Sequence, residues 1–181
     1  MQVNVFHLLK SSVGAEIECE VNEKADIAGD GQQHPIRGKL RLVRTDRSIL
    51  VRGTLHTEVE GSCARCLCPL SSPLTLSITE EYFLLVDIAS GLALPPPDEP
   101  DSFTIDDHHV LDLMEAIRQY ALLVIPMKML CRPDCAGLCP DCGHNLSQGP
   151  CGCPPEEINP QWAALIELKT KQPANERKGT D

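Results

Sequence analysis

Six of the ten cysteines crowd into one short stretch near the end of the chain. At its centre, Cys139-Pro140-Asp141-Cys142-Gly143 has the form of a zinc knuckle, in which a two-residue gap lets both thiolates reach one ion. The following glycine permits a tight turn with backbone N–H groups directed at sulfur. Because this stretch has almost no large apolar side chains, metal would supply most of its folding free energy. We therefore predict a structural zinc site with ligands among Cys131, Cys135, Cys139, Cys142, Cys151 and Cys153.

Six thiols are two more than one zinc ion needs. Cys139 and Cys142 form the knuckle, and the remaining two ligands are either the pair at 131 and 135 or the pair at 151 and 153. The sequence does not choose between these pairs. A redox dithiol and an iron–sulfur cluster are the alternative interpretations, but no thioredoxin-like pattern surrounds the cysteines, and the knuckle form favours zinc.

A second motif, Cys63-Ala64-Arg65-Cys66, lies at the end of an expected strand. With the six later thiols it makes eight, enough for two four-thiolate ions, so the protein would hold one Zn²⁺ or two. The alternative is that Cys63 and Cys66 are small, half-buried residues at a turn. Cys19 lies on the apolar side of its strand, and we expect it in the core.

A cluster of cations is the other chemically informative feature. Residues 37–52 contain six Lys or Arg and one acid, a local excess of five positive charges. Alternation places three of them on one strand face, and the next strand adds a fourth. Guanidinium groups bind phosphate, which predicts RNA contacts. The alternative is a solvated face neutralised by Glu16, Glu18 and Glu20. The candidate RNA contacts are Arg37, Lys39, Arg41 and Arg52.

Strands must position these groups, because the first eighty-odd residues alternate between apolar and polar side chains. Alternation runs over 15–21, 36–44 and 49–60, and another strand covers 74–85. If residues 45–48 form a hairpin loop, three pairs face each other across it. These pairs are Leu42 with Val51, Gly38 with Leu55, and Arg41 with Arg52.

The predicted fold class is α+β. Residues 1–86 form an antiparallel, partly closed sheet, and 87–106 form a mobile loop rich in proline and acids. Apolar residues at helical spacing predict one long helix, which Asp106 or Asp107 caps, packed on the sheet. The remaining segments are that helix over 107–130, a zinc-binding module over 131–155, a terminal helix over 156–171 and a frayed tail over 172–181.

Composition limits the function. The 181 residues carry a net charge of −10, and only 3% are aromatic, which argues against base stacking on an exposed sheet. No run approaches the roughly 20 apolar residues of a membrane span, and the start has no signal peptide, so we expect a cytoplasmic protein. No Ser–His–Asp order or phosphate-binding glycine loop is present, so we expect neither an enzyme nor a small-molecule substrate. We find no internal repeat.

The cysteine stretch, Cys131-x3-Cys135-Ala-Gly-Leu-Cys139-Pro-x-Cys142-Gly with a later Cys151-x-Cys153, resembles the YceD-like family of large ribosomal RNA subunit accumulation proteins. Other stretches agree: the element at 63–67, the apolar helix end at 122–126, and residues 159–165, where Gln161 replaces the family's arginine. The resemblance spans roughly residues 40–170.

This resemblance implies a bacterial cytosolic protein that is needed for normal levels of large-subunit (23S) rRNA, and it implies no enzyme. The expected partner is rRNA or an early protein of the large ribosomal subunit. The alternative is an acidic, zinc-stabilised binding module or chaperone for a basic protein, since the chain is strongly acidic.

Overall fold

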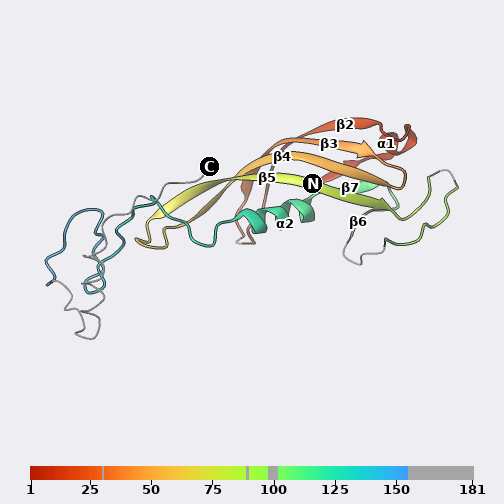
Figure 1. Ribbon diagram of the computed structural model, residues 1–181. Helices are drawn as coiled ribbons and strands as arrows, with labels where there is room; N and C mark the ends of the chain where they lie inside the picture. Colours follow the sequence, from red (N-terminus) through yellow and green to blue (C-terminus); the bar gives the residue numbers. More distant parts are fainter. Residues whose placement is uncertain (30, 89, 98–101, 155–181) are drawn as a thin grey trace, which may run out of the picture. The chain divides into compact units, whose positions relative to one another are not determined.

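The computed structural model describes residues 1–29, 31–88, 90–97 and 102–154 (Figure 1). The chain divides into two compact units, Met1–Cys135 and Ala136–Asp181. The first unit contains every described helix and strand. In order these are β1 (Gln2–Asn4), α1 (Phe6–Lys10), β2 (Glu16–Ala25), β3 (His34–Arg44), β4 (Ser48–Ser62), β5 (Pro69–Leu84), β6 (Phe103–Ile105), β7 (Val110–Asp112) and α2 (Met114–Val124).

A five-stranded sheet forms the body, in the order β2-β3-β4-β5-β6. Its first four strands are antiparallel, while the short β6 runs parallel to β5. The prediction of a sheet body is confirmed. The described strands leave β2 and β6 as two open edges, so the expected partial closure is not seen among them. A separate two-stranded sheet joins β1 to β7.

The predicted central hairpin is confirmed residue by residue. Leu42 lies opposite Val51, and Arg41 lies opposite Arg52. Gly53 shows how closely β3 and β4 approach, because a Cβ atom there would lie 2.2 Å from the carbonyl oxygen of Lys39. Only a residue without a side chain fits where the two backbones come this close, so Gly53 is needed for β3 and β4 to pair as they do.

One face of the sheet is buried, and the alternation seen in the sequence decides which face. Leu40, Val51, Leu55 and Leu76 are fully buried, and α1 and α2 add apolar residues to the same core. Figure 1 shows α2 lying beside β5. The Tyr120 hydroxyl fastens it there, since this group donates to the carbonyl oxygen of Thr79 at 3.0 Å and accepts from its N–H at 3.3 Å. The opposite, polar face carries the cations considered below.

The prediction of one long helix over 107–130 is not confirmed. Residues 110–112 pair with β1 instead, so α2 begins only at Met114. Asp106 caps a turn and no helix: its Oδ1 accepts the N–H groups of His108 and Val110, and His109 takes a left-handed φ of 60°. Non-local pairing with the N-terminal strand has overridden the helical periodicity, which local sequence could not reveal.

Other elements also differ from the expectation. Three short elements have no clear signal in the sequence: α1, β1 and β6, each of five residues or fewer. Of these, β6 lies inside the expected loop over 87–106. The expected terminal helix (156–171) and tail (172–181) lie outside the described residues.

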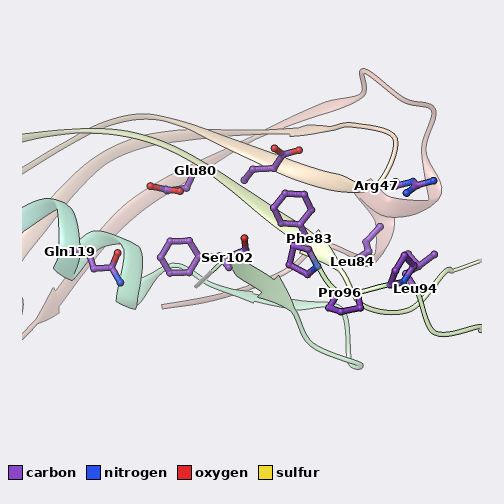
Figure 2. Close-up of a pocket in the computed structure, with 12 residues that line it drawn as sticks. Arg47, Glu80, Phe83, Leu84, Leu94, Pro96, Ser102 and Gln119 are labelled. Atoms are coloured by element: carbon purple, nitrogen blue, oxygen red, sulfur yellow. The ribbon is translucent and has the colours of Figure 1, made fainter. Parts of the chain in front are cut away.

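A cavity of about 710 Å³ opens beside the end of β5. Figure 2 shows Phe83 and Leu84 of β5 near Pro96 and Leu94, with Arg47 close by. None of the cysteines and none of the four candidate RNA contacts lines this cavity. It therefore adds nothing to the predicted chemistry, which concentrates elsewhere.

Candidate metal centres and a basic sheet face

Eight of the ten cysteines gather into two groups of four. In each group all the sulfur atoms lie within 4.8 Å of one another, close enough to share one ion. The first cluster lies in the first unit and the second cluster in the second unit, so each is complete on its own. The first cluster is Cys63, Cys66, Cys131 and Cys135, and the second is Cys139, Cys142, Cys151 and Cys153.

This arrangement answers a question that the sequence left open. The Cys139–Cys142 knuckle is completed by the pair at 151 and 153, while Cys131 and Cys135 join the earlier motif at 63–66. The expected module of residues 131–155 is therefore divided at Cys135, where the first unit ends. Cys19 and Cys68 remain outside both clusters, and Cys19 packs against the hydrophobic core as expected.

The first knuckle, residues 63–68, forms the tip between β4 and β5. Leu67 donates its N–H to the carbonyl oxygen of Cys63 at 2.9 Å, and Cys63 donates its own N–H to the carbonyl oxygen of Cys68 at 2.9 Å. Leu67 has a left-handed φ of 58°, a conformation that costs a residue with a side chain roughly 1–2 kcal/mol. The strained turn places the thiols of Cys63 and Cys66 in the same cluster.

The second knuckle, residues 139–144, has the same backbone pattern. Gly143 donates to the carbonyl oxygen of Cys139 at 2.9 Å, Cys139 donates to that of His144 at 2.8 Å, and the φ of Gly143 is 70°. The two knuckles therefore match position by position, with Leu67 in the place of Gly143 and Cys68 in the place of His144. The chain thus contains a six-residue structural repeat that the sequence analysis missed, because the glycine that marks such turns is absent from the first copy.

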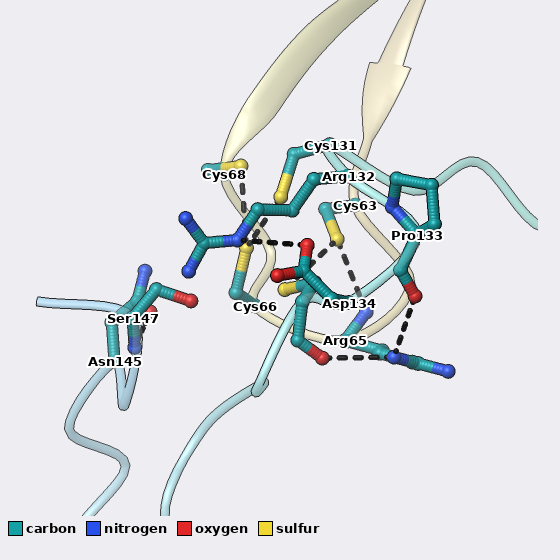
Figure 3. Close-up of polar contacts among 11 residues, drawn as sticks. Cys63, Arg65, Cys66, Cys68, Cys131, Arg132, Pro133, Asp134, Asn145 and Ser147 are labelled. Atoms are coloured by element: carbon teal, nitrogen blue, oxygen red, sulfur yellow. Dashed lines mark hydrogen bonds and ion pairs between the residues drawn. The ribbon is translucent and has the colours of Figure 1, made fainter.

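Sulfur distances in the first cluster suit a tetrahedral ion. Four thiolates about 2.3 Å from one zinc ion lie about 3.8 Å from each other. Cys63 and Cys135 have their sulfurs 3.9 Å apart, and Cys66 and Cys131 have theirs 3.7 Å apart (Figure 3). The Cys68 sulfur lies only 3.3 Å from that of Cys66, shorter than such an edge. The geometry therefore selects four of the five thiols at this tip.

Other contacts hold the same segments together. The Arg65 guanidinium donates to the carbonyl oxygens of Pro133 at 3.3 Å and Cys135 at 2.9 Å (Figure 3). The Ala64 N–H donates to the carbonyl oxygen of Met129 at 2.8 Å. Thus the hairpin tip and the segment that follows α2 are joined by hydrogen bonds as well as by the meeting of their thiols.

Backbone N–H groups favour the thiolate form of two cysteines in the first cluster and one in the second: the N–H of Cys68 lowers the pKa of Cys66. Those of Cys131, Cys66 and Arg65 lower the pKa of Cys63 to about 5. Those of Cys142 and Asp141 lower the pKa of Cys139 to about 7. In the same second cluster, a hydrogen bond with Cys142 and burial raise the pKa of Cys153 to about 12. Without a cation, only some of the four thiols in a cluster are thus negatively charged. A bound cation would let all four thiols deprotonate.

The four candidate RNA contacts do share the exposed polar face of the sheet. Two of them have acidic partners on β2: Lys39 Nζ lies 2.6 Å from Glu18 Oε1, and Arg41 lies 3.6 Å from Glu16. The hydrogen bond and charge of Lys39 lower the pKa of Glu18. Among the described residues Arg37 and Arg52 form no ion pair, so the predicted acidic row neutralises the face only in part.

Hydroxyl groups extend this face beside Arg52. Across the β4–β5 ladder, Arg52 lies opposite Thr79, and Thr54 lies opposite Ser77. The same face is mixed beyond these positions, because the next outward residues beside Arg52 are the apolar Val43 and Leu50 and the acidic Glu81. The cationic and hydroxyl groups of this face can donate hydrogen bonds to phosphate and sugar oxygens.

None of the described helices is both long enough and apolar enough to cross a membrane.

Comparison with known proteins gives one family. A family profile described as "Large ribosomal RNA subunit accumulation protein YceD" matches residues 51–169, a stretch that includes both clusters. Uncharacterized proteins of Mycobacterium tuberculosis and Mycobacterium bovis are each 36% identical over 129 residues, which is 71% of this chain and 59% of the relative. An uncharacterized protein of Mycobacterium leprae is 28% identical over 134 residues, which is 74% of this chain and again 59% of the relative. The chain thus matches about three fifths of the length of these curated relatives, and no solved structure matches it.

Proposed function

Because this chain belongs to the YceD family of large ribosomal RNA subunit accumulation proteins, we propose that it is a non-enzymatic ribosome-biogenesis factor that supports the accumulation of 23S rRNA in the bacterial cytoplasm. Membership of the family carries this proposal. The family description supports a role in ribosome biogenesis, and the partner and mechanism are the parts that we add.

The proposed direct partner is rRNA, bound on the exposed face of β3 and β4. Arg37 and Arg52 support this, since they are the candidate cations without an ion pair in the described part of the chain. The neighbouring hydroxyls of Thr54 and Thr79 can donate to phosphate oxygens and 2′-hydroxyl groups. The shortage of aromatic side chains favours contact with the sugar–phosphate backbone over base stacking.

We further propose that each cluster holds one structural Zn²⁺. Four thiolates form the donor set that zinc prefers at closed, non-catalytic sites, and the sulfur spacings of the first cluster suit it. A closed four-sulfur shell leaves no position for a reacting water, which agrees with a non-enzymatic role. In this protein zinc would fix the hairpin tip and would order the second unit.

Charge reversal tests the RNA proposal. Arg52→Glu should weaken binding to a transcribed 23S rRNA fragment and reduce the slope of log affinity against log salt by about 1, as loss of one phosphate contact does. Lys128→Glu, at an exposed position after α2, changes net charge by the same amount and should leave the slope unchanged. Equal effects of the two variants would reject this face as the RNA site.

A test in cells addresses the role itself. Deleting the gene should lower the ratio of large-subunit to small-subunit rRNA, and the wild-type gene should restore it. An unchanged ratio with normal ribosomal subunit profiles would refute the proposed role independently of any binding result.

A protein partner is the second candidate. The ion pairs of Lys39 and Arg41 with Glu18 and Glu16 leave fewer cations for RNA, and the ten-residue β2 is an acidic open edge. Such an edge could accept a basic, extended segment of a large-subunit ribosomal protein. Recovery of that protein with this chain after nuclease treatment would favour this candidate over direct RNA binding.

A further inference from the structure

Two thiols are left over once the clusters are formed, and they differ in their surroundings. Cys19 lies on β2 against the core, far along the chain from any cluster residue. Cys68 is partly exposed, and its sulfur lies 3.3 Å from that of Cys66, a member of the first cluster. The first cluster therefore has a fifth sulfur in contact with one of its four thiols.

The knuckle backbone holds Cys68 in this place. Its carbonyl oxygen accepts the N–H of Cys63 at 2.9 Å, which closes the turn. In the second knuckle the same position is His144, so the described part of that cluster offers no matching spare thiol. A disulfide bond is about 2.05 Å long, so the two sulfurs would need to approach by only about 1.3 Å.

We propose that Cys66 and Cys68 form an oxidation site for a peroxide, and that the disulfide they form releases the metal of the first cluster. This inference rests on the proposed zinc at that cluster. Cys68 is the accessible partner and is not part of the four-thiol set, whereas Cys66 is 6% exposed. Cys68 therefore meets the oxidant, and Cys66 is the thiol that traps the product.

The chemistry takes two balanced steps. The Cys68 thiol gives up its proton and attacks one peroxide oxygen as the thiolate, the O–O bond breaks, the departing oxygen takes up the proton, and a sulfenic acid and water (or an alcohol) form. The Cys66 thiolate then attacks the Cys68 sulfur, the S–S bond forms, and the departing hydroxide takes up a proton to leave as water. The peroxide gains two electrons, and each sulfur loses one. Three thiolates remain, one fewer than a closed zinc site requires.

Zinc release and disulfide mapping test this site on the full-length, zinc-loaded chain. One equivalent of hydrogen peroxide should release one of the two zinc ions, detected with a chromophoric chelator, and a dithiol reductant with added zinc should restore it. Mass spectrometry of the peptide holding residues 66–68 should show the loss of two hydrogens. Before oxidation, Cys68→Ser should bind as much zinc as wild type. After peroxide is added, it should release zinc at least about tenfold more slowly than wild type, because the thiol next to Cys66 is gone.

Cys19→Ser is the matched control, since it also removes a thiol outside both clusters, and it should release zinc at the wild-type rate. Equal release from Cys68→Ser and wild type, or a disulfide mapped to another pair, would overturn the proposal. If the zinc proposal itself is wrong, the result is different: before oxidation, wild type and Cys63→Ser would contain the same amount of zinc per chain. Mapping of the disulfide between Cys66 and Cys68 is independent of zinc content, so it distinguishes failure of the oxidation site from failure of the zinc proposal.

Discussion

Leu67→Gly is expected to tighten metal binding at the first cluster, although it removes a large side chain. Leu67 is 64% exposed, so few packing contacts are lost, and its φ of 58° is a strained conformation. Relief of that strain gains roughly 1–2 kcal/mol, and the greater freedom of glycine in the unfolded chain costs about 0.5–1 kcal/mol. The midpoint of the difference is about 0.75 kcal/mol, which corresponds to about three- to fourfold in affinity because folding and metal binding are coupled.

Competition against a chromophoric zinc chelator would measure this change. The background should carry Cys139→Ser and Cys142→Ser, so that only the first cluster is titrated. Leu67→Ala is the matched control, since it removes most of the same side chain but keeps the backbone strain, and it should show no gain. In a separate background that carries Cys63→Ser and Cys66→Ser, so that only the second cluster is titrated, Gly143→Ala should weaken binding by a similar factor, because it introduces the strain that Leu67 already carries. If Leu67→Gly bound zinc no more tightly than Leu67→Ala, the matched-knuckle reasoning would be refuted.

Three further predictions test the sites and the sheet. Cys63→Ser should lower bound zinc by one ion per chain in elemental analysis while Cys19→Ser should not, and equal losses would contradict the assignment of the clusters. Gly53→Ala should destabilise the sheet by about 1–3 kcal/mol in urea unfolding, because its Cβ atom would lie 2.2 Å from the carbonyl oxygen of Lys39; an unchanged midpoint would show that the strands can separate there. By NMR titration Glu18 should lose its proton below the ordinary pKa of 4.5, and Lys39→Met should return that pKa toward 4.5. Since the folded-state pKa is lowered, the small stabilisation from this pair should be present above pH 4.5 and disappear as the pH falls through the lowered value.

The sequence predicted the central hairpin well because alternation and loop position together fix its register. Arg41 faces Arg52 as expected, since the loop at 45–48 leaves no other pairing with the apolar residues on one face. The start of α2 was wrong for the opposite reason: residues 110–112 carry helical periodicity but pair with β1, more than a hundred residues earlier in the chain. Local pattern contains no information about that partner.

The sequence predicted that the cysteines are metal ligands, but it did not predict which four of them come together in each cluster. Two-residue spacing identified both knuckles, whereas the assignment of Cys131 and Cys135 to the first cluster depends on how the segment after α2 returns to the hairpin tip. The basic face was also predicted only in part. Its four cations do share one sheet face, as alternation predicted, but the pairing of β2 with β3 decides that Lys39 and Arg41 have acidic partners while Arg52 has none in the described chain.

The two clusters differ in how much chain each one encloses. The second closes a short loop within residues 139–153, but the first joins thiols that lie 72 positions apart, with β5, β6, β7 and α2 between them. An ion there would act as a covalent cross-link does, by restricting the unfolded chain. Chain entropy gives about 4 kcal/mol for a loop of this size and about 3 kcal/mol for the shorter one. We expect a chelator to lower the unfolding midpoint of the whole sheet body in the wild type and to have no such effect in Cys63→Ser. A metal held at the tip of one hairpin would thus determine the stability of elements that it does not contact.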